Sequence, residues 1–205
     1  MCPCSNALPK RLSIIRTFWT RSAIEPDEQR RIEPEHRANA VAYPDSISTR
    51  GRAVTLTQSQ QKLYLEDLCV GDTFTSRHYE MSAERVFSFA SEFDPQPFHI
   101  DPVAAQQSFF NGLAASGWHT SAVVMRLFAE SVPLATGIIG AGCNVEWLSV
   151  VRPGDILHVV STVKDITPSK SKPDRGIVIM ENLAINQDDV ICQRNTATLL
   201  VFRRP

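Results

Sequence analysis

The chain lacks long apolar runs and any marked excess of one charge. None of its segments approaches the roughly 18 consecutive apolar residues that a membrane-spanning helix needs. Basic and acidic side chains nearly balance, and the formal net charge at pH 7 is -1. Balanced charge provides no general attraction to nucleic acid or to an anionic membrane surface. We therefore expect neither a membrane nor a nucleic acid as a partner.

Cysteine is scarce as well. The 5 cysteines form an odd and scattered set. Cys2 and Cys4 flank a proline, but no second Cys/His pair lies at zinc-finger spacing to complete a metal site. We interpret the cysteines as reduced thiols of an intracellular protein, and we expect a cytoplasmic location.

Residues 1–60 differ in composition from the rest of the chain. Arg, Glu, Ser, Pro and Thr dominate there, and only residues 10–21 have apolar content. Such a composition buries too little apolar surface to fold alone, which predicts a poorly ordered extension. Two alternatives stay open. Residues 10–21 are basic, acid-free and amphipathic, as in an organelle transit peptide, and the segment also suits a docking arm.

Residues 61–205 have the patterning of one α+β domain. Alternating, β-rich content predicts a first strand over residues 73–81. Four later segments are also β-rich and are joined by short, turn-rich connections: residues 143–151, 155–166, 176–186 and 190–202. Short connections make these segments antiparallel neighbours. The expected core is thus a five-stranded antiparallel sheet.

Three helices are predicted between the first strand and the later ones, and the shortest covers residues 103–110. Residues 118–132 are small or apolar nearly all round, so we expect a buried central helix wrapped by the sheet. Residues 83–93 form an earlier helix whose expected buried face carries four apolar side chains, namely Val86, Phe89, Ala90 and Phe93. That helix must end near residue 94, because a proline follows.

A short proline-rich segment follows this helix. Pro95 and Pro97 fix their own φ angles and disfavour helical backbone at Asp94 and Gln96. The segment from Asp94 to His99 is therefore predicted to be a stiff, irregular loop with an acid at one end and an imidazole at the other. Binding and catalytic residues are common on loops that a rigid scaffold positions.

These segments resemble the MaoC-like family of hot-dog-fold acyl-CoA hydratases and dehydratases. The resemblance rests on the motif FDPQPFHID, the following SGWHT, the turn VRPGD and the hairpin SKSKPDRGIV, which occur in family order. Many members have Gly-Asp where this chain has Phe93-Asp94 and Asn-Pro at Gln96-Pro97, and some carry Ser at Met125. These departures concern the shape of the acyl group more than the reaction.

The resemblance implies reversible hydration of a 2-enoyl-CoA to a 3-hydroxyacyl-CoA, with no metal and no cofactor. It also implies a homodimer or a dimer of dimers. Asp94 and His99 become the catalytic dyad, and histidine and tuned carboxylates suit proton transfer near neutral pH. Gly117 becomes the backbone oxyanion donor, because the first turn of a helix presents free N–H groups. The alternatives from the residues alone are a loop cap at Asp94, packing at His99 and tight turning at Gly117.

Further residues are candidates for substrate contact. Three adjoin Gly117, namely Ser116, Trp118 and His119, and His119 is equally compatible with packing. Three more make a basic hairpin tip for the phosphates of coenzyme A, namely Lys170, Lys172 and Arg175, although exposed charge at a turn commonly serves only solvation. Asp101 precedes a proline and is best explained as the N-cap of the next helix.

Two other functions compete with hydration. A hot-dog thioesterase typically places a lone acid on or beside the central helix, and here that helix offers only Glu130, near its far end. A non-catalytic acyl-CoA-binding subunit is the second competitor. Loss of Asp94 or His99 would have favoured it, and both residues are present.

Overall fold

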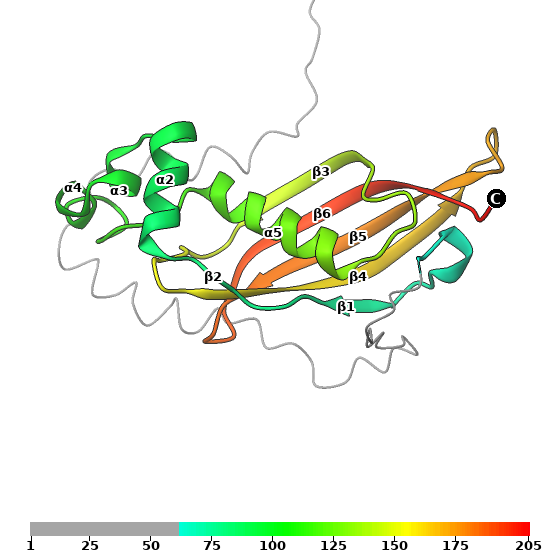
Figure 1. Cartoon of the computed structure of the whole chain (residues 1–205), viewed down its shortest axis with the longest axis horizontal. Helices are drawn as coiled ribbons and strands as arrows, with labels where there is room; N and C mark the ends of the chain where they lie inside the picture. The colour runs from blue at the N-terminus through cyan, green and yellow to red at the C-terminus, as the bar shows by residue number, and fades with distance from the viewer. Residues whose placement is uncertain (1–61) are drawn as a thin grey trace, which may run out of the picture. The chain divides into compact units, whose positions relative to one another are not determined.

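An antiparallel sheet forms the base of the fold (Figure 1). The structure, a computed structural model, describes residues 62–205, so the extension predicted over residues 1–60 lies outside the described residues. Along the sheet the strand order is β1-β4-β5-β6-β3, and the short β2 also pairs with β4. The predicted α+β class and antiparallel sheet are confirmed, with six strands in place of five.

Four long strands make most of the sheet: β3 (Gly140–Trp147), β4 (Ile156–Pro168), β5 (Arg175–Ile185) and β6 (Ile191–Phe202). Each lies where the β-rich segments predicted a strand. The first predicted strand is divided into β1 (Thr73–Thr75) and β2 (Tyr79–Glu80). Thr75 lies opposite Val160 but Tyr79 lies opposite Leu157, so one extra residue bulges out between them.

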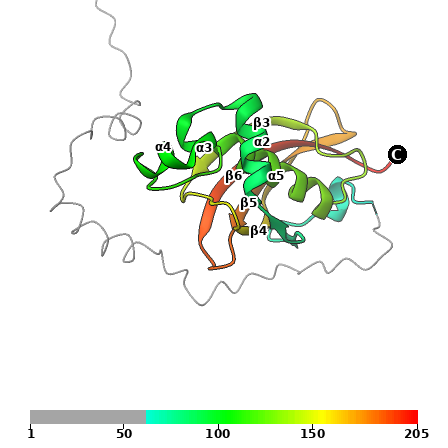
Figure 2. The same ribbon diagram turned by 60° about the vertical axis from the view of Figure 1, so that its left-hand side comes forward.

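The central helix α5 (Gly117–Ser131) lies along one face of this sheet (Figures 1 and 2). Its Ser116 N-cap accepts a hydrogen bond from the Trp118 N–H at 3.2 Å. We expected a helix buried on most sides. Only the face toward the sheet is buried, whereas Trp118 is 61% exposed and Met125 is 44% exposed. The apolar outer face has no cover from residues 62–205 of this chain.

Two clusters of buried apolar side chains fix α5 on the sheet. One includes Phe128, Met180 and Leu199, and the other includes Leu127 and Leu157. Burying each such side chain contributes about 1.5–3 kcal/mol. This packing holds the N-terminal end of α5 at one end of the sheet.

Shorter helices gather near that end of α5 (Figures 1 and 2): α2 (Ala83–Phe93), α3 (Pro97–Ile100) and α4 (Pro102–Gln106). The 3-10 turn η1 (Leu65–Asp67) precedes the sheet. Val86 and Ala90 of α2 are buried as predicted. Phe89 is only partly buried, and Phe93, which packs on Phe89, is 63% exposed. None of the helices in residues 62–205 is long and apolar enough to cross a membrane.

Candidate active site

Asp94 and His99 are brought together because the prolines end one helix and start another. Asp94 ends α2, and its N–H still donates to the Ala90 carbonyl at 2.9 Å. We predicted an irregular loop from Asp94 to His99. The second half of this segment is instead helical, because α3 begins at Pro97. Proline favours the first helical position, and this one turn directs His99 back toward Asp94. The His99 Nε2 atom lies 3.3 Å from Asp94 Oδ2.

The Asp94 carboxylate is held from two further sides. Ser116 Oγ donates to Oδ2 at 2.7 Å, and Gln96 Nε2 donates to Oδ1 at 2.7 Å. Burial raises the pKa of Asp94, but these two hydrogen bonds and the charge of His99 outweigh it, so the pKa lies below its ordinary value. Asp94 is therefore a carboxylate at neutral pH and an acceptor of protons.

The orientation of the imidazole follows from its other nitrogen. The ring of His99 is buried, with 5% exposure, and Nδ1 lies 2.8 Å from the carbonyl oxygen of Ala114. A carbonyl only accepts, so Nδ1 carries a proton and donates it. The other ring nitrogen, Nε2, therefore faces the Asp94 carboxylate.

The N-terminus of α5 completes the cluster. Ser116 both caps the helix and donates to Asp94, so the dyad is tied directly to the helix start. Within residues 62–205 the Gly117 N–H has no hydrogen-bond acceptor. A free N–H in the first turn, at the positive end of the helix, suits a developing oxyanion.

Trp147 adjoins this position, and sequence reasoning did not identify it. Its Nε1 donates to the Gly117 carbonyl at 2.9 Å, and its ring makes an edge contact with Trp118. A Cβ atom added at Gly117 would lie 2.8 Å from Trp147 Cε2. A larger residue at this position would therefore displace the half-exposed ring of Trp147. The two residues are 30 positions apart in the sequence, so no local pattern predicts their contact.

Arg152, from the turn VRPGD, was also missed. Its guanidinium donates to the carbonyls of Gly112 at 2.9 Å and Leu113 at 3.2 Å, and also to that of Phe110. These bonds hold the segment that leads directly to Ala114. Arg152 therefore positions the carbonyl that orients His99, although it does not touch the dyad itself.

The other predicted contacts near the helix start have separate places. Trp118 lies exposed beside Trp147. His119 is buried and stacks on Phe89 with ring centroids 4.7 Å apart, which agrees with the packing interpretation. Burial lowers the pKa of His119, and the charge of Arg85 lowers it further. Asp101 caps α4 as expected, accepting from two backbone N–H groups at 2.8 and 3.1 Å.

The basic hairpin tip lies far from the dyad within one chain. The tip joins β4 to β5 at the end of the sheet opposite to α2, α3 and α4 (Figure 1). Arg175 there pairs with Asp174 at 2.6 Å and lies over the Phe202 ring. Lys170 and Lys172 belong to the same turn. Contact of this tip with coenzyme A stays a prediction.

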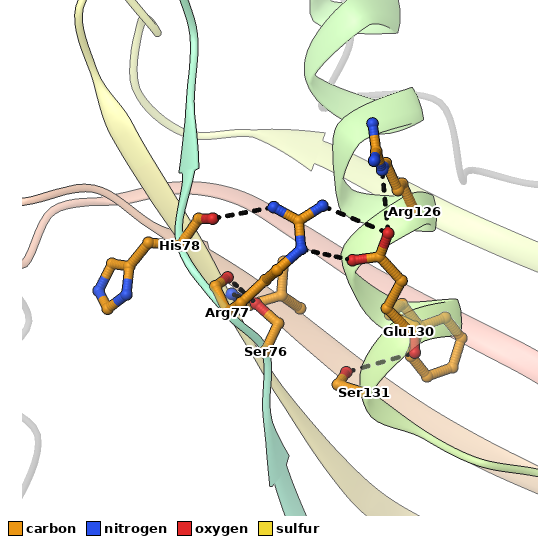
Figure 3. Close-up of polar contacts among 8 residues, drawn as sticks. Ser76, Arg77, His78, Arg126, Glu130 and Ser131 are labelled. Carbon is orange, nitrogen blue, oxygen red and sulfur yellow. Dashed lines mark hydrogen bonds and ion pairs between the residues drawn. The ribbon is translucent and has the colours of Figure 1, made fainter.

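Glu130, the acid that a thioesterase would need, is engaged in ion pairs (Figure 3). Arg77 Nε lies 2.8 Å from one carboxylate oxygen, and Arg126 Nε lies 3.0 Å from the other. Hydrogen bonds from Arg77 and then Arg126 lower the pKa of Glu130. A carboxylate paired with two guanidiniums is a weak base, and it lies near the end of α5 remote from Gly117.

One helix along the face of one antiparallel sheet is the hot-dog fold, shared here with known hydratases and dehydratases. The chain belongs to the family of the MaoC-like domain, whose model matches residues 69–182. It is also 29% identical over 142 residues to the uncharacterised protein YdeM of Bacillus subtilis, covering 68% of this chain and 99% of that one.

Solved structures agree with this result, one at the level of the family and one at the level of the fold. The chain resembles a MaoC-like dehydratase from Rhodospirillum rubrum with 56% identity and a TM-score of 0.69, covering 70% of this chain and 99% of that chain. An (R)-hydratase from Pseudomonas aeruginosa, PhaJ1, has 22% identity and a TM-score of 0.60, with coverage of 70% and 88%. At that identity the second match shows the fold alone.

Proposed function

We propose that the protein catalyses the reversible addition of water to a 2-enoyl-CoA, giving the 3-hydroxyacyl-CoA. The observation that carries this proposal is the contact between Asp94 Oδ2 and His99 Nε2, 3.3 Å apart, beside the start of α5. A water molecule placed against both atoms can form a hydrogen bond to each of them and lose a proton to the pair.

The reaction then follows from the positions of these groups. The water oxygen bonds to the β-carbon, and the dyad takes the proton that the water loses. The electron pair of the C=C bond moves to the thioester oxygen as an enolate, and the dyad afterwards returns one proton to the α-carbon. If His99 receives the proton, its imidazolium faces the Asp94 carboxylate and is stabilised by it. The two groups are in direct contact, so the proton is assigned to the dyad as a whole.

The enolate oxygen needs a donor while it carries charge. The Gly117 N–H at the start of α5 supplies one, together with the positive end of the helix. Removing a single donor of this kind typically lowers kcat by about 10²–10³-fold. The family and the 56% identical MaoC-like dehydratase support hydration or dehydration of an acyl-CoA as the class of reaction.

A second copy of the chain is part of the proposal. β3 lies at the edge of the sheet, and it is exposed along nearly its whole length. The outer face of α5 and the residues after β3 add apolar surface, including Met125, Trp147 and Leu148. Unpaired strand edges and apolar patches favour association. We therefore expect a homodimer through β3, alone or in pairs, with a mass of two or four chains by light scattering.

The test is loss of the enoyl absorbance when the purified protein is mixed with 2-enoyl-CoA thioesters. The panel includes short, branched and dicarboxylic acyl groups, because Phe93 and Met125 differ from the residues common in the family and affect the shape of the acyl group that fits. Asp94→Asn should abolish most of the turnover, and Asp101→Asn is the matched control, since it makes the same change at a helix cap. Binding without turnover across the panel would favour a non-catalytic subunit, and release of free coenzyme A would favour a thioesterase.

A further inference from the structure

A row of polar side chains crosses the buried face of the sheet beneath α5. Ser161 of β4 lies opposite Asn182 of β5, and Asn182 lies opposite Asn195 of β6. Gln193 is two residues from Asn195 on β6 and faces the same side. We call Ser161, Asn182, Gln193 and Asn195 the polar row. Ser161, Asn182 and Gln193 have 0% exposure.

The polar row separates the two apolar clusters of the core. On one side, Val163, Met180 and Ala197 belong to the first cluster, and on the other side Val159 and Ala184 belong to the second. A continuous apolar core would be the simpler way to pack a helix on a sheet. The interruption therefore calls for an explanation other than packing.

Most of the hydrogen-bonding groups in the polar row are unsatisfied by residues 62–205. Five atoms have no hydrogen-bond partner there: Ser161 Oγ, Asn182 Nδ2, Asn182 Oδ1, Gln193 Nε2 and Asn195 Oδ1. Buried polar groups are nearly always hydrogen-bonded, because an unmade bond costs the full desolvation of the group. Five such atoms in one place are free to bond a group that brings its own donors and acceptors.

The polar row is connected to the proposed active site through α5. Gln193 Oε1 accepts a hydrogen bond from Ser121 Oγ at 3.0 Å, and the same hydroxyl lies 3.0 Å from the Gly117 carbonyl. Ser121 is one helical turn beyond Gly117, a rise of about 6 Å. Ser121 thus links the polar row directly to the turn of α5 that carries the Gly117 N–H.

We infer that the polar row binds a hydroxyl group on the acyl chain, so that the preferred substrate is a short, hydroxylated 2-enoyl-CoA; this rests on the proposed function. The row consists of one hydroxyl and three amides and contains no charge, so it suits a neutral group that both donates and accepts. A carboxylate would be buried there without a cation, which is costly. A plain alkyl chain would leave all five atoms unsatisfied.

The test compares matched substrates on the full-length protein. The kcat/KM values of but-2-enoyl-, pent-2-enoyl- and hex-2-enoyl-CoA are measured beside those of their ω-hydroxylated counterparts. Because two new neutral hydrogen bonds form, we expect at least one hydroxylated member to be favoured by about tenfold or more. Asn182→Leu should remove that preference while turnover of the alkyl series is kept or increased.

Controls separate this inference from its rivals. Thr162→Val changes a neighbour on the other face of β4 and should leave the preference intact. If Asn182→Leu does not fold, Asn195→Val carries the same test. Equal kcat/KM for the two series, or a preference that survives both variants, would mean that the row holds internal water only and would overturn the inference alone. No turnover in either series would overturn the proposed function, and this inference with it.

Discussion

Gly117 lies between a helix start that needs a free N–H and an indole ring that leaves no room for a side chain. In Gly117→Ala the new Cβ would lie 2.8 Å from Trp147, so the ring must move. Alanine keeps the N–H, but its methyl group would hold the thioester oxygen of the substrate away from it. We therefore expect kcat to fall by about 10²-fold, the typical effect of losing an oxyanion donor. In Gly117→Ala/Trp147→Ala the clash with the ring is absent, and we still expect low kcat because the methyl group still obstructs the substrate's thioester carbonyl. Recovery in the double variant would reduce Gly117 to a packing role.

His119 should make stability depend on pH. Its pKa is lowered by burial and by Arg85, so the unfolded chain binds its proton more readily than the folded one does. The stability from neutral His119 is complete above the unfolded pKa of about 6.5 and declines as pH falls below it. His119→Phe keeps the stack on Phe89 and removes the titration. Its Tm should therefore fall less than that of the wild type between pH 7 and pH 5, and identical slopes would contradict this.

The residues of the site differed in how far the sequence predicted them. The family motif predicted Asp94, His99 and Gly117 as site residues, and the turn at Pro97 explains why Asp94 and His99 lie in contact. Trp147 and Arg152 act on partners 30 to 42 residues away. Such contacts depend on the register of β3 and on the path of the loop before α5, and neither is encoded by local spacing.

At the scale of elements, Arg152 is expected to link the turn before β4 to the loop before α5. Arg152→Met removes a guanidinium that serves three carbonyls. The free energy of unfolding should fall by about 2–4 kcal/mol in urea, since hydrogen bonds to charged groups are each worth about 1.5–3 kcal/mol. The kcat should fall as well, because the Ala114 carbonyl loses its support.

Arg152→Lys provides the graded control for this prediction. Lysine keeps the charge but lacks the planar fork, so its stability and kcat should lie between those of the wild type and Arg152→Met. A methionine variant as stable and as active as the wild type would show that the loop holds its shape without the guanidinium.

Periodicity was a good guide to the elements whose packing is regular. The long strands and α5 follow simple alternation or helical spacing, so their positions were predicted well. The predicted strand over residues 73–81 is divided because Ser76 Oγ accepts from the Val159 N–H at 2.8 Å, where a backbone carbonyl would otherwise lie. The outer face of α5 was expected to be buried, and its apolar residues instead suit a partner chain.

At the scale of the whole molecule, residues 1–58 are proposed to be dispensable for both folding and turnover. Residues 62–205 already contain the sheet, the core clusters and the candidate site. A chain that begins at Ser59 should therefore stay soluble and dimeric by light scattering, with the kcat/KM of the full-length protein. Loss of folding, or a monomer, would instead show that the removed segment completes the core or the interface.

The most direct measurement of the central claim is a double-mutant cycle on kcat for Asp94→Asn and His99→Ala with the best enoyl-CoA substrate. If both groups hold one water, each single change should lower kcat by about 10²-fold or more. The double variant should then be scarcely slower than the poorer single variant, because groups that act as a unit are non-additive. Near-normal turnover in His99→Ala, or two losses that simply multiply, would contradict the shared-water mechanism.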